Sequence, residues 1–462
     1  MTLFQSNQGH ISEKMMGSEN LFKYAKSVIP GGVSANIKYF APHPIFMDKG
    51  NGSRLIDVDG HEYIDYLLCY GALLLGHGHP EVTAAVYNQL TTAGTAVIGA
   101  PHVLEVEMAN KLIEHFPGIE MVRYTNSGLE ATLLAIRLAQ AYTGKTTIAK
   151  FEGHYHGGYN EVLVSVNPTI EEAGNEKKPN SVPESKGIST HNVENTIILP
   201  FNNLKATEQI LRQYKDKIAA VIIEPVQGGF IPAEEGFMIG LRKLTQNLGI
   251  ILIFDEVKTG FRLTLGGAQS IYGIKPDLTA LGKVLGGGFP VGAVGGLQEI
   301  MELMDPSNGG DILSAGGKAI KKDHVLFHSG TYNGHPIVLA AGLATIKVLE
   351  KDNVYPGLIQ KTENLRSSLE KLYQSYGMEM QTVGMGSIFN IVHTNQSIKN
   401  YRDLLKADMK LRENIDYELL KLGIYTKPLN RYSMSIVHTD EDIKETVRKH
   451  EMAIKIVKGI DS

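Results

Sequence analysis

Two stretches decide the fold that we expect: Ile250-Ile-Leu-Ile-Phe-Asp-Glu-Val257 and Leu281-Gly-Lys-Val-Leu-Gly-Gly-Gly-Phe-Pro-Val-Gly-Ala293. The continuous apolar run in the first is typical of a strand in a parallel sheet that helices cover on both faces, and ligands of such sheets bind beyond the carboxyl ends of the strands. Asp255 lies at such an end. In the second stretch, the glycines around Lys283 let the backbone approach a flat cofactor closely.

Lys283 and Asp255 predict a specific chemistry when they are taken together. A lysine amine condenses with a carbonyl when it is held unprotonated beside the reacting carbon, which makes Lys283 a candidate Schiff-base lysine. An acid such as Asp255 can keep a pyridinium nitrogen protonated, so that the ring of pyridoxal 5'-phosphate acts as an electron sink. Taken alone, Lys283 is equally consistent with a solvated lysine in a turn, and Asp255 with a helix cap.

Composition excludes several classes of protein. A chain of 462 residues with 43% hydrophobic content can bury a large core, and it exceeds the about 250–300 residues at which single cores stop growing. The net charge of −4 provides no basic stripe for nucleic acid or a membrane surface. The first ten residues resemble no leader, and no apolar run reaches the about 18 residues of a membrane helix, so we expect a cytoplasmic protein with small-molecule substrates.

The single cysteine, Cys69, excludes an internal disulfide and a cysteine-built zinc site. We read it as a small buried hydrophobic residue. The His-x-His pairs at 77/79 and 154/156 have no acidic partners at metal-ligand spacing, so loop hydrogen bonding is favoured over a metal site for them.

Hydrophobic patterning predicts three regions. Residues 54–65 alternate on both sides of Asp59-Gly60, which indicates a hairpin. From Pro80 onward, helical segments such as 234–248 alternate with apolar strands such as 219–224, as in βαβ units. After about residue 328 the pattern becomes long helices and two pairs of hairpin-like strands. We therefore expect an N-terminal segment 1–75 that contributes to a small domain, a large domain 76–327 and a C-terminal small domain 328–462. The helices and hairpins expected in the last region are 336–351, 362–376, 378–393 and 423–438.

Two long polar stretches, residues 167–195 and 305–322, are predicted to be loops. A structureless loop of about 20 residues inside a compact domain is unusual and is often an active-site lid or a disordered segment.

The segment Thr125-Asn-Ser-Gly-Leu-Glu-Ala131 opens a helix predicted over 130–142. The amides of Ser127, Gly128 and Leu129 would face outward at its positive end, where a phosphate binds well. An ordinary helix start that binds only water fits the same residues. In Gly153-His-Tyr-His-Gly-Gly158, Tyr155 is a candidate for stacking on a flat ring.

Several segments agree with this chemistry in collinear order. They are Asn126-Ser-Gly-Leu-Glu-Ala131, Phe151-Glu-Gly-His-Tyr-His-Gly157, Glu224-Pro-Val-Gln-Gly228, Asp255-Glu-Val-Lys-Thr-Gly-Phe-Arg262, Gly282-Lys283 and Gly330-Thr-Tyr-Asn-Gly-His-Pro336. Together they resemble the class III pyridoxal-phosphate-dependent aminotransferases, a family that includes the glutamate-1-semialdehyde 2,1-aminomutases. The likeness extends over nearly the whole chain.

This resemblance implies an α/β protein of the pyridoxal-phosphate transferase fold type I, with a mostly parallel sheet covered by helices in the large domain and a small α+β domain built from both termini. It also implies a homodimer with sites at the subunit interface, in which Thr331 reaches the phosphate of the cofactor in the partner subunit. Neither the dimer nor the role of Thr331 follows from composition or spacing.

The resemblance also implies individual roles. Lys283 corresponds to the Schiff-base lysine, Asp255 to the partner of the pyridinium nitrogen, Tyr155 to the stacking ring and Val257 to the residue packed behind the ring. Gly128 and its neighbours, Ser127 and Leu129, correspond to the phosphate loop.

Other positions depart from the family pattern. Leu129 replaces the usual threonine, so a hydroxyl is lost from the phosphate loop. Lys38 replaces the arginine of the aminomutases, and a point charge takes the place of a carboxylate-binding fork. Gly229 lacks the side chain found there in related enzymes. Residues 427–432 replace a glutamate-containing segment, and Arg431 is a candidate there for a substrate carboxylate, unless it is a surface residue of a hairpin.

These departures favour an aminotransferase that moves an amino group between an amino acid and an oxo acid, with β-amino acids and secondary-metabolite intermediates as open substrate classes. The alternative is a glutamate-1-semialdehyde 2,1-aminomutase that makes 5-aminolevulinate, for which residues 167–195 would act as a lid. A nicotinamide dehydrogenase would need a Gly-x-Gly-x-x-Gly turn between an early strand and a helix, and the sequence shows no such turn in that context. A non-catalytic relative would be expected to lose Lys283 or Asp255.

Overall fold

A computed structural model describes residues 17–308 and 325–460. Most of the loop predicted over 305–322 lies outside these ranges. No helix within them combines the length and the apolar character that crossing a membrane requires.

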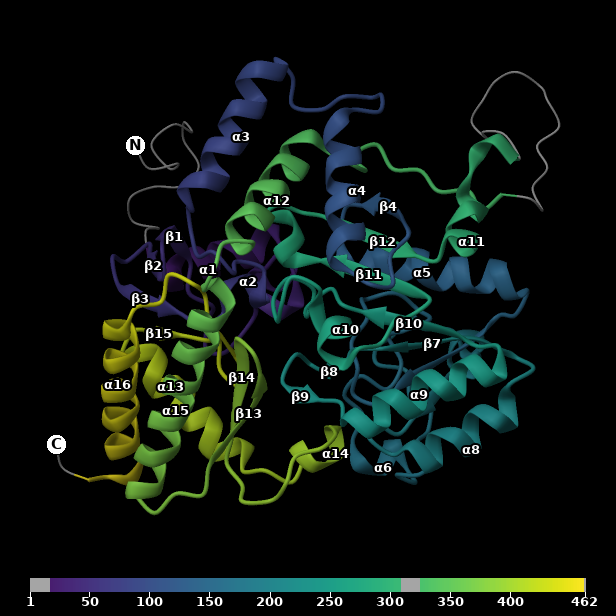
Figure 1. The fold of residues 1–462 in the computed structure, drawn as a ribbon. Coiled ribbons are helices and arrows are strands. Elements are labelled where there is room, and N and C mark those ends of the chain that lie inside the picture. Colours follow the sequence, from purple (N-terminus) through teal and green to yellow (C-terminus); the bar gives the residue numbers. More distant parts are fainter. Residues whose placement is uncertain (1–16, 309–324, 461–462) are drawn as a thin grey trace.

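A seven-stranded sheet forms the centre of the larger part of the molecule (Figure 1). Its neighbouring strands are parallel, except that β12 runs antiparallel to both β4 and β11. The expected mostly parallel sheet is therefore confirmed. In spatial order the strands are β4 (Met121–Thr125), β12 (Gly292–Gly296), β11 (Leu278–Gly282), β10 (Ile251–Asp255), β7 (Ile218–Ile223), β5 (Thr147–Phe151) and β6 (Thr196–Leu199).

The central strand β10 shows why this sequence forms a covered sheet. Ile251 and Ile253 pack in one apolar cluster with helix α5 (Gly128–Thr143), whereas Leu252 and Phe254 pack on the other face with α8 (Leu204–Tyr214) and α9 (Glu235–Leu248). Successive side chains of a strand point to opposite faces, so both faces are buried. Asp255 continues the alternation of Ile251 and Ile253 toward the α5 side.

A second sheet joins the two ends of the chain. The strands β2 (Arg54–Asp57) and β3 (Glu62–Asp65) form the predicted hairpin, with Leu55 opposite Tyr63. Strand β1 (Met47–Asn51) pairs with β2, and β15 (Ile424–Tyr425) runs parallel to β3. Chain segments from before residue 66 and after residue 423 therefore share one sheet. The domain boundaries themselves stay a prediction.

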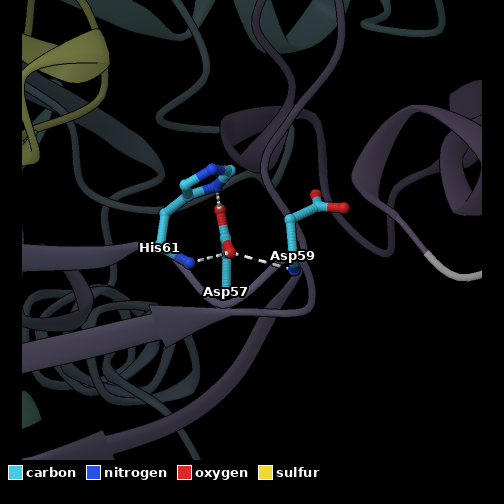
Figure 2. A group of neighbouring side chains, drawn as sticks. All are labelled: Asp57, Asp59 and His61. Atoms are coloured by element: carbon cyan, nitrogen blue, oxygen red, sulfur yellow. Dashed lines mark hydrogen bonds and ion pairs between the residues drawn. The ribbon is translucent and has the colours of Figure 1, made fainter.

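The turn of this hairpin gathers Asp57, Asp59 and His61 (Figure 2). One carboxylate oxygen of Asp57 accepts the amides of Asp59 at 2.9 Å and His61 at 2.8 Å. The other oxygen lies 3.0 Å from His61 Nδ1 and accepts the hydroxyl of Tyr63 at 2.9 Å. Both oxygens are thus used within the hairpin, and the group closes a turn.

The C-terminal region contains the helices α12 (Pro336–Leu349), α13 (Val354–Ser375), α15 (Met409–Lys421) and α16 (Asp440–Lys458). The last three gather at one side of the molecule, away from α8 and α9 (Figure 1). Strands β13 (Gln381–Met385) and β14 (Ile388–Val392) form the hairpin predicted over 378–393.

Three expectations are wrong. Residues 423–438 form no hairpin, because β15 pairs with β3 while β16 (Tyr432–Ser433) pairs with β14 in another sheet. Cys69 is exposed, since it lies in a turn with Leu68 and Tyr70 where all three residues have positive φ angles. Residues 167–195 are not structureless, because they contain the short helices α6 (Ile170–Ala173) and α7 (Thr190–Glu194).

A buried ion pair orders the chain just before Arg431. Nε of Arg412 donates to both carboxylate oxygens of Asp416 at 2.8 Å, and both residues lie on α15. Asp416 also accepts the amide of Leu429 at 2.7 Å, and Arg412 donates to the carbonyl of Asn430 at 2.8 Å. The pair therefore fixes residues 429–430 from both sides.

We predict that Asp416→Ala lowers the free energy of unfolding by about 3–5 kcal/mol, because the buried guanidinium of Arg412 would lose its counter-charge. Urea unfolding followed by circular dichroism measures this change. The control is Glu413→Ala on the same helix, whose ion pair with Lys410 is mostly exposed and should contribute less than about 1 kcal/mol. Equal effects of the two substitutions would contradict the prediction.

Candidate active site

A cavity of about 560 Å³ lies at the carboxyl ends of the central strands. It brings together most of the residues predicted from the sequence, although they come from separate segments of the chain. The predicted residues among its lining are Gly128, Leu129, Tyr155, Asp255, Val257, Lys283 and Arg431.

Lys283 directly follows β11 and adopts a positive φ of 48° at the start of a short 3₁₀ turn, η4 (Lys283–Gly286). A left-handed backbone is uncommon for a residue with a long side chain and marks a functional site in many proteins. Burial lowers the pKa of Lys283, while the carboxylate of Asp255 opposes this shift and Arg431 adds to it. The amine is therefore unprotonated at a lower pH than an exposed lysine, as condensation with a carbonyl requires.

Asp255 is held in a fixed orientation at the end of β10. One of its oxygens accepts the amide of Val257 at 3.0 Å, and the other lies 2.8 Å from Nδ1 of His156. Both side chains are buried, with Asp255 only 5% exposed. His156 thus positions the carboxylate from the side of the 153–158 loop, a role that the sequence analysis did not assign to it.

Helix α5 begins at the edge of the cavity. Ser127 is its N-cap, and its hydroxyl accepts the amide of Glu130 at 3.2 Å. The amides of Gly128 and Leu129 lie in the first turn, where a helix has no internal acceptor for them. A Cβ atom on Gly128 would lie 2.4 Å from Cγ1 of Val257, so only glycine permits this close approach.

Tyr155 and Glu224 form one wall. Tyr155 lines the cavity and is nevertheless 55% exposed. One carboxylate oxygen of Glu224 accepts the amides of Tyr155 at 3.0 Å and Gly228 at 3.4 Å. Glu224 therefore ties the loop that carries Tyr155 to the turn at Gly228.

Arg431 approaches the cavity from the C-terminal segment and is partly buried, so it is not a surface residue of a hairpin. Burial lowers its pKa, and Glu224 opposes that shift. Within residues 17–308 and 325–460, its guanidinium makes no hydrogen bond or ion pair with another side chain. Lys258, which the sequence analysis overlooked, lines the same cavity and donates to the carbonyl of Gly228 at 3.0 Å.

Two predicted residues lie elsewhere. The ammonium of Lys38 is exposed and donates to the hydroxyl of Ser34 at 2.8 Å, while its neighbour Ile37 lines the cavity. Thr331 is exposed in a turn and is not part of the cavity wall of its own chain. The direct substrate contact considered for Lys38 has no support in this arrangement.

The outer wall joins the predicted lid to the C-terminal region. Tyr401, at the start of α14 (Tyr401–Leu404), donates to the side-chain oxygen of Asn167 at 3.0 Å and to the carbonyl of Pro168 at 2.8 Å. Arg402 donates to both oxygens of Glu152 at 2.7 and 2.9 Å. Only the beginning of residues 167–195 borders the cavity, and its action as a lid stays a prediction.

The arrangement fits pyridoxal 5'-phosphate. Because Gly128 lies so close to Val257, the first amides of α5 border the cavity, where they can bind a phosphate. Lys283 and Asp255 line the same cavity. His156, Lys258 and Glu224 belong to the site but were missed as functional residues. Their signals were present in the sequence, because each stands in or beside a motif that was recognised for another residue.

Comparisons with known proteins agree with this site. Residues 38–454 match the family model of the class III aminotransferases. A glutamate-1-semialdehyde 2,1-aminomutase of Ignicoccus hospitalis is 41% identical over 446 residues, which cover 95% of this chain and 99% of that protein.

Two solved structures show the same architecture. An omega-transaminase from Sphaerobacter thermophilus has a TM-score of 0.90 and 34% identity, covering 97% of this chain and 99% of that chain. A beta-phenylalanine aminotransferase from Variovorax paradoxus has a TM-score of 0.82 and 32% identity, covering 96% and 94%.

We predict that Gly128→Ala weakens the binding of pyridoxal 5'-phosphate about 5- to 150-fold, because overpacking against Val257 costs about 1–3 kcal/mol and displaces the helix amides. Absorbance titration of the cofactor-free protein measures the dissociation constant. Gly236→Ala is the matched control, since a Cβ atom there meets no neighbour within 4 Å. Unchanged affinity in the Gly128 variant would show that the close approach is not needed.

Proposed function

Since this chain belongs to the class III aminotransferases, we propose that it transfers an amino group between a carboxylate-bearing amino acid and an oxo acid. Arg431 carries the proposal. Its guanidinium lines the same cavity as Lys283 and has no anionic partner in the part of the chain that the structure describes. Arginine binds both oxygens of a carboxylate, and this would hold the reacting carbon of a substrate near Lys283.

The proposed function assigns a separate role to each residue of the site. Pyridoxal 5'-phosphate, the cofactor of this family, supplies an electron sink for the reacting carbon when it is bound. The amine of Lys283 would then take a proton from the amino-bearing carbon of the donor and, in the second half of the reaction, a proton would be delivered to the carbon of the oxo acid that receives the amino group, since burial favours the neutral form of this amine. Asp255, oriented by His156, would keep a proton on the ring nitrogen, and the first amides of α5 would bind the phosphate.

The names of the curated relatives favour a second candidate, a glutamate-1-semialdehyde 2,1-aminomutase that returns the amino group to a neighbouring carbon of the same molecule. Against it stands the position of Lys38. This residue replaces the arginine of the aminomutases, yet its ammonium bonds to Ser34 outside the cavity. We therefore place the substrate carboxylate at Arg431 and give precedence to transfer between two molecules.

We further propose a homodimer, in which Thr331 binds the cofactor phosphate of the partner subunit. Two exposed features support it: Thr331 lies on the surface in a turn, and Tyr155 is 55% exposed although it lines the cavity. The exposed apolar side chains Tyr87, Val103 and Val106 on helices α3 (Pro80–Ala93) and α4 (Val103–His115) would be covered in such a dimer.

The deciding experiment supplies the cofactor-loaded protein with glutamate 1-semialdehyde alone, and separately with pairs of amino and oxo acids. Transfer that requires the oxo acid supports the aminotransferase. Formation of 5-aminolevulinate without any second substrate would establish the aminomutase instead. Lys283→Ala is the control for both assays, because it removes the amine that moves the proton and should abolish turnover in each.

We predict that Arg431→Met raises KM for amino-acid donors by about 10- to 100-fold, because charge-assisted hydrogen bonds contribute about 1.5–3 kcal/mol. The reaction of an amine without a carboxylate, such as 1-phenylethylamine, should change less than about threefold. Arg448→Met, on the exposed face of α16, is the matched control. An equal loss with both donor types would mean that Arg431 supports the fold and not the substrate.

A further inference from the structure

Lys258 and the turn at Gly228–Gly229 are complementary in shape. Gly229 has a positive φ of 82°, and a Cβ atom there would lie 2.5 Å from Cδ and 2.6 Å from Cε of Lys258. Any side chain at position 229 would therefore clash with Lys258 in its observed position. The lysine stem occupies the space that glycine leaves, and this brings its ammonium to the cavity wall.

The ammonium of Lys258 is incompletely satisfied by protein. Lys258 is only 5% exposed, and Nζ donates to the carbonyl of Gly228 at 3.0 Å. No carboxylate in residues 17–308 and 325–460 forms an ion pair with it within 4.0 Å, although Glu224 is near enough to affect its pKa. One oxygen of Glu224 already accepts the amides of Tyr155 and Gly228. An ammonium has three donors, so a buried one in this setting needs a further anionic or polar acceptor.

Arg431 also lies close to this turn. A Cβ atom on Gly228 would lie 3.8 Å from Nη1 of Arg431, so this guanidinium and the ammonium of Lys258 both lie beside the backbone of Gly228 and Gly229. The two cations come from separate elements, the turn after β10 and the C-terminal segment. A substrate with one carboxylate would use the fork of Arg431 and leave Lys258 without an anion.

We propose that Lys258 is a specificity-determining residue, which binds a second carboxylate of the substrate while Arg431 binds the first. The preferred substrates are then dicarboxylic amino and oxo acids. This inference rests on the proposed function, because it assigns the substrate class of the same cavity. The cavity of about 560 Å³ has room for such a small molecule beside the cofactor.

The charges around Lys258 add a measurable consequence. Burial lowers its pKa well below the usual value, Arg431, Lys283 and Arg262 add to that shift, and Glu224 opposes it. A bound carboxylate raises the pKa again, because it stabilises the protonated form. Binding of a dicarboxylate should therefore be accompanied by proton uptake, and its affinity should fall as the pH rises through the pKa of Lys258.

The test uses the cofactor-loaded protein and two unreactive probes of equal chain length, glutarate with two carboxylates and valerate with one. Isothermal titration calorimetry in buffers of different ionisation enthalpy gives the dissociation constant and the proton uptake. We expect Lys258→Met to weaken glutarate binding about tenfold or more and to abolish the associated proton uptake, because a charged hydrogen bond is lost. Valerate binding should change less than about threefold.

Two variants complete the design. Lys243→Met replaces an exposed lysine of α9 and should bind glutarate like the unmodified protein. Gly229→Ala keeps the charge of Lys258 but displaces its stem, so it should also lose glutarate selectivity; thermal unfolding of the variant shows whether it is folded.

Equal losses for glutarate and valerate in Lys258→Met would overturn the inference, because Lys258 would then only support the turn. The absence of any preference for glutarate in the unmodified protein would overturn it as well. If the two probes behave as expected but no oxo acid accepts an amino group, the proposed function fails while the dicarboxylate site stands.

Discussion

The contact between the start of helix α5 and the turn after β10 is the constraint on which the site depends. Gly128 approaches Val257 so closely that a single added carbon atom would lie 2.4 Å from it. This contact follows from the layers of the fold, because α5 packs on the face of β10 that carries Ile251 and Ile253. The next residue in that alternation, Asp255, is thereby brought to the same edge as the free amides of the helix. The packing of α5 on β10 therefore determines both the position of the acid and the position of the helix end that we propose for the phosphate.

Burial then determines what the cations of the cavity can do. Lys283, Lys258 and Arg431 all have a lowered pKa, and burial is the largest cause in each case. Their consequences differ with their surroundings. Lys283 has Asp255 nearby and needs its neutral form to act on a substrate carbon. Arg431 stays protonated at any working pH, so an anion that binds to it stabilises its buried charge. Under the proposed function, the same physical effect thus favours a proton carrier at position 283 and a carboxylate-binding residue at position 431.

The sequence alone predicts the parts of this site that local patterns determine. The apolar run of β10 places Asp255 at a strand end, and the glycines around Lys283 indicate a close backbone approach. What it does not predict are contacts between distant segments. The pairing of β15 with β3 depends on tertiary packing, and so does the direction of the Lys38 ammonium. Lys258 is the clearest case, since its place in the cavity depends on the absence of a side chain at a glycine 29 positions earlier in the chain.

The substrate contact that we propose depends on a region distant in sequence from Asp255 and Lys283. Arg431 reaches the cavity because Arg412 and Asp416 hold residues 429–430 from α15, a helix that contacts β14 and β15. A change in this support would move the carboxylate receptor and leave the α5–β10 contact intact. Lys258 is different, because it follows Val257 directly and is fixed to the cofactor side of the cavity. A dicarboxylate held between Lys258 and Arg431 would therefore connect the two regions, so that substrate binding itself would set their distance.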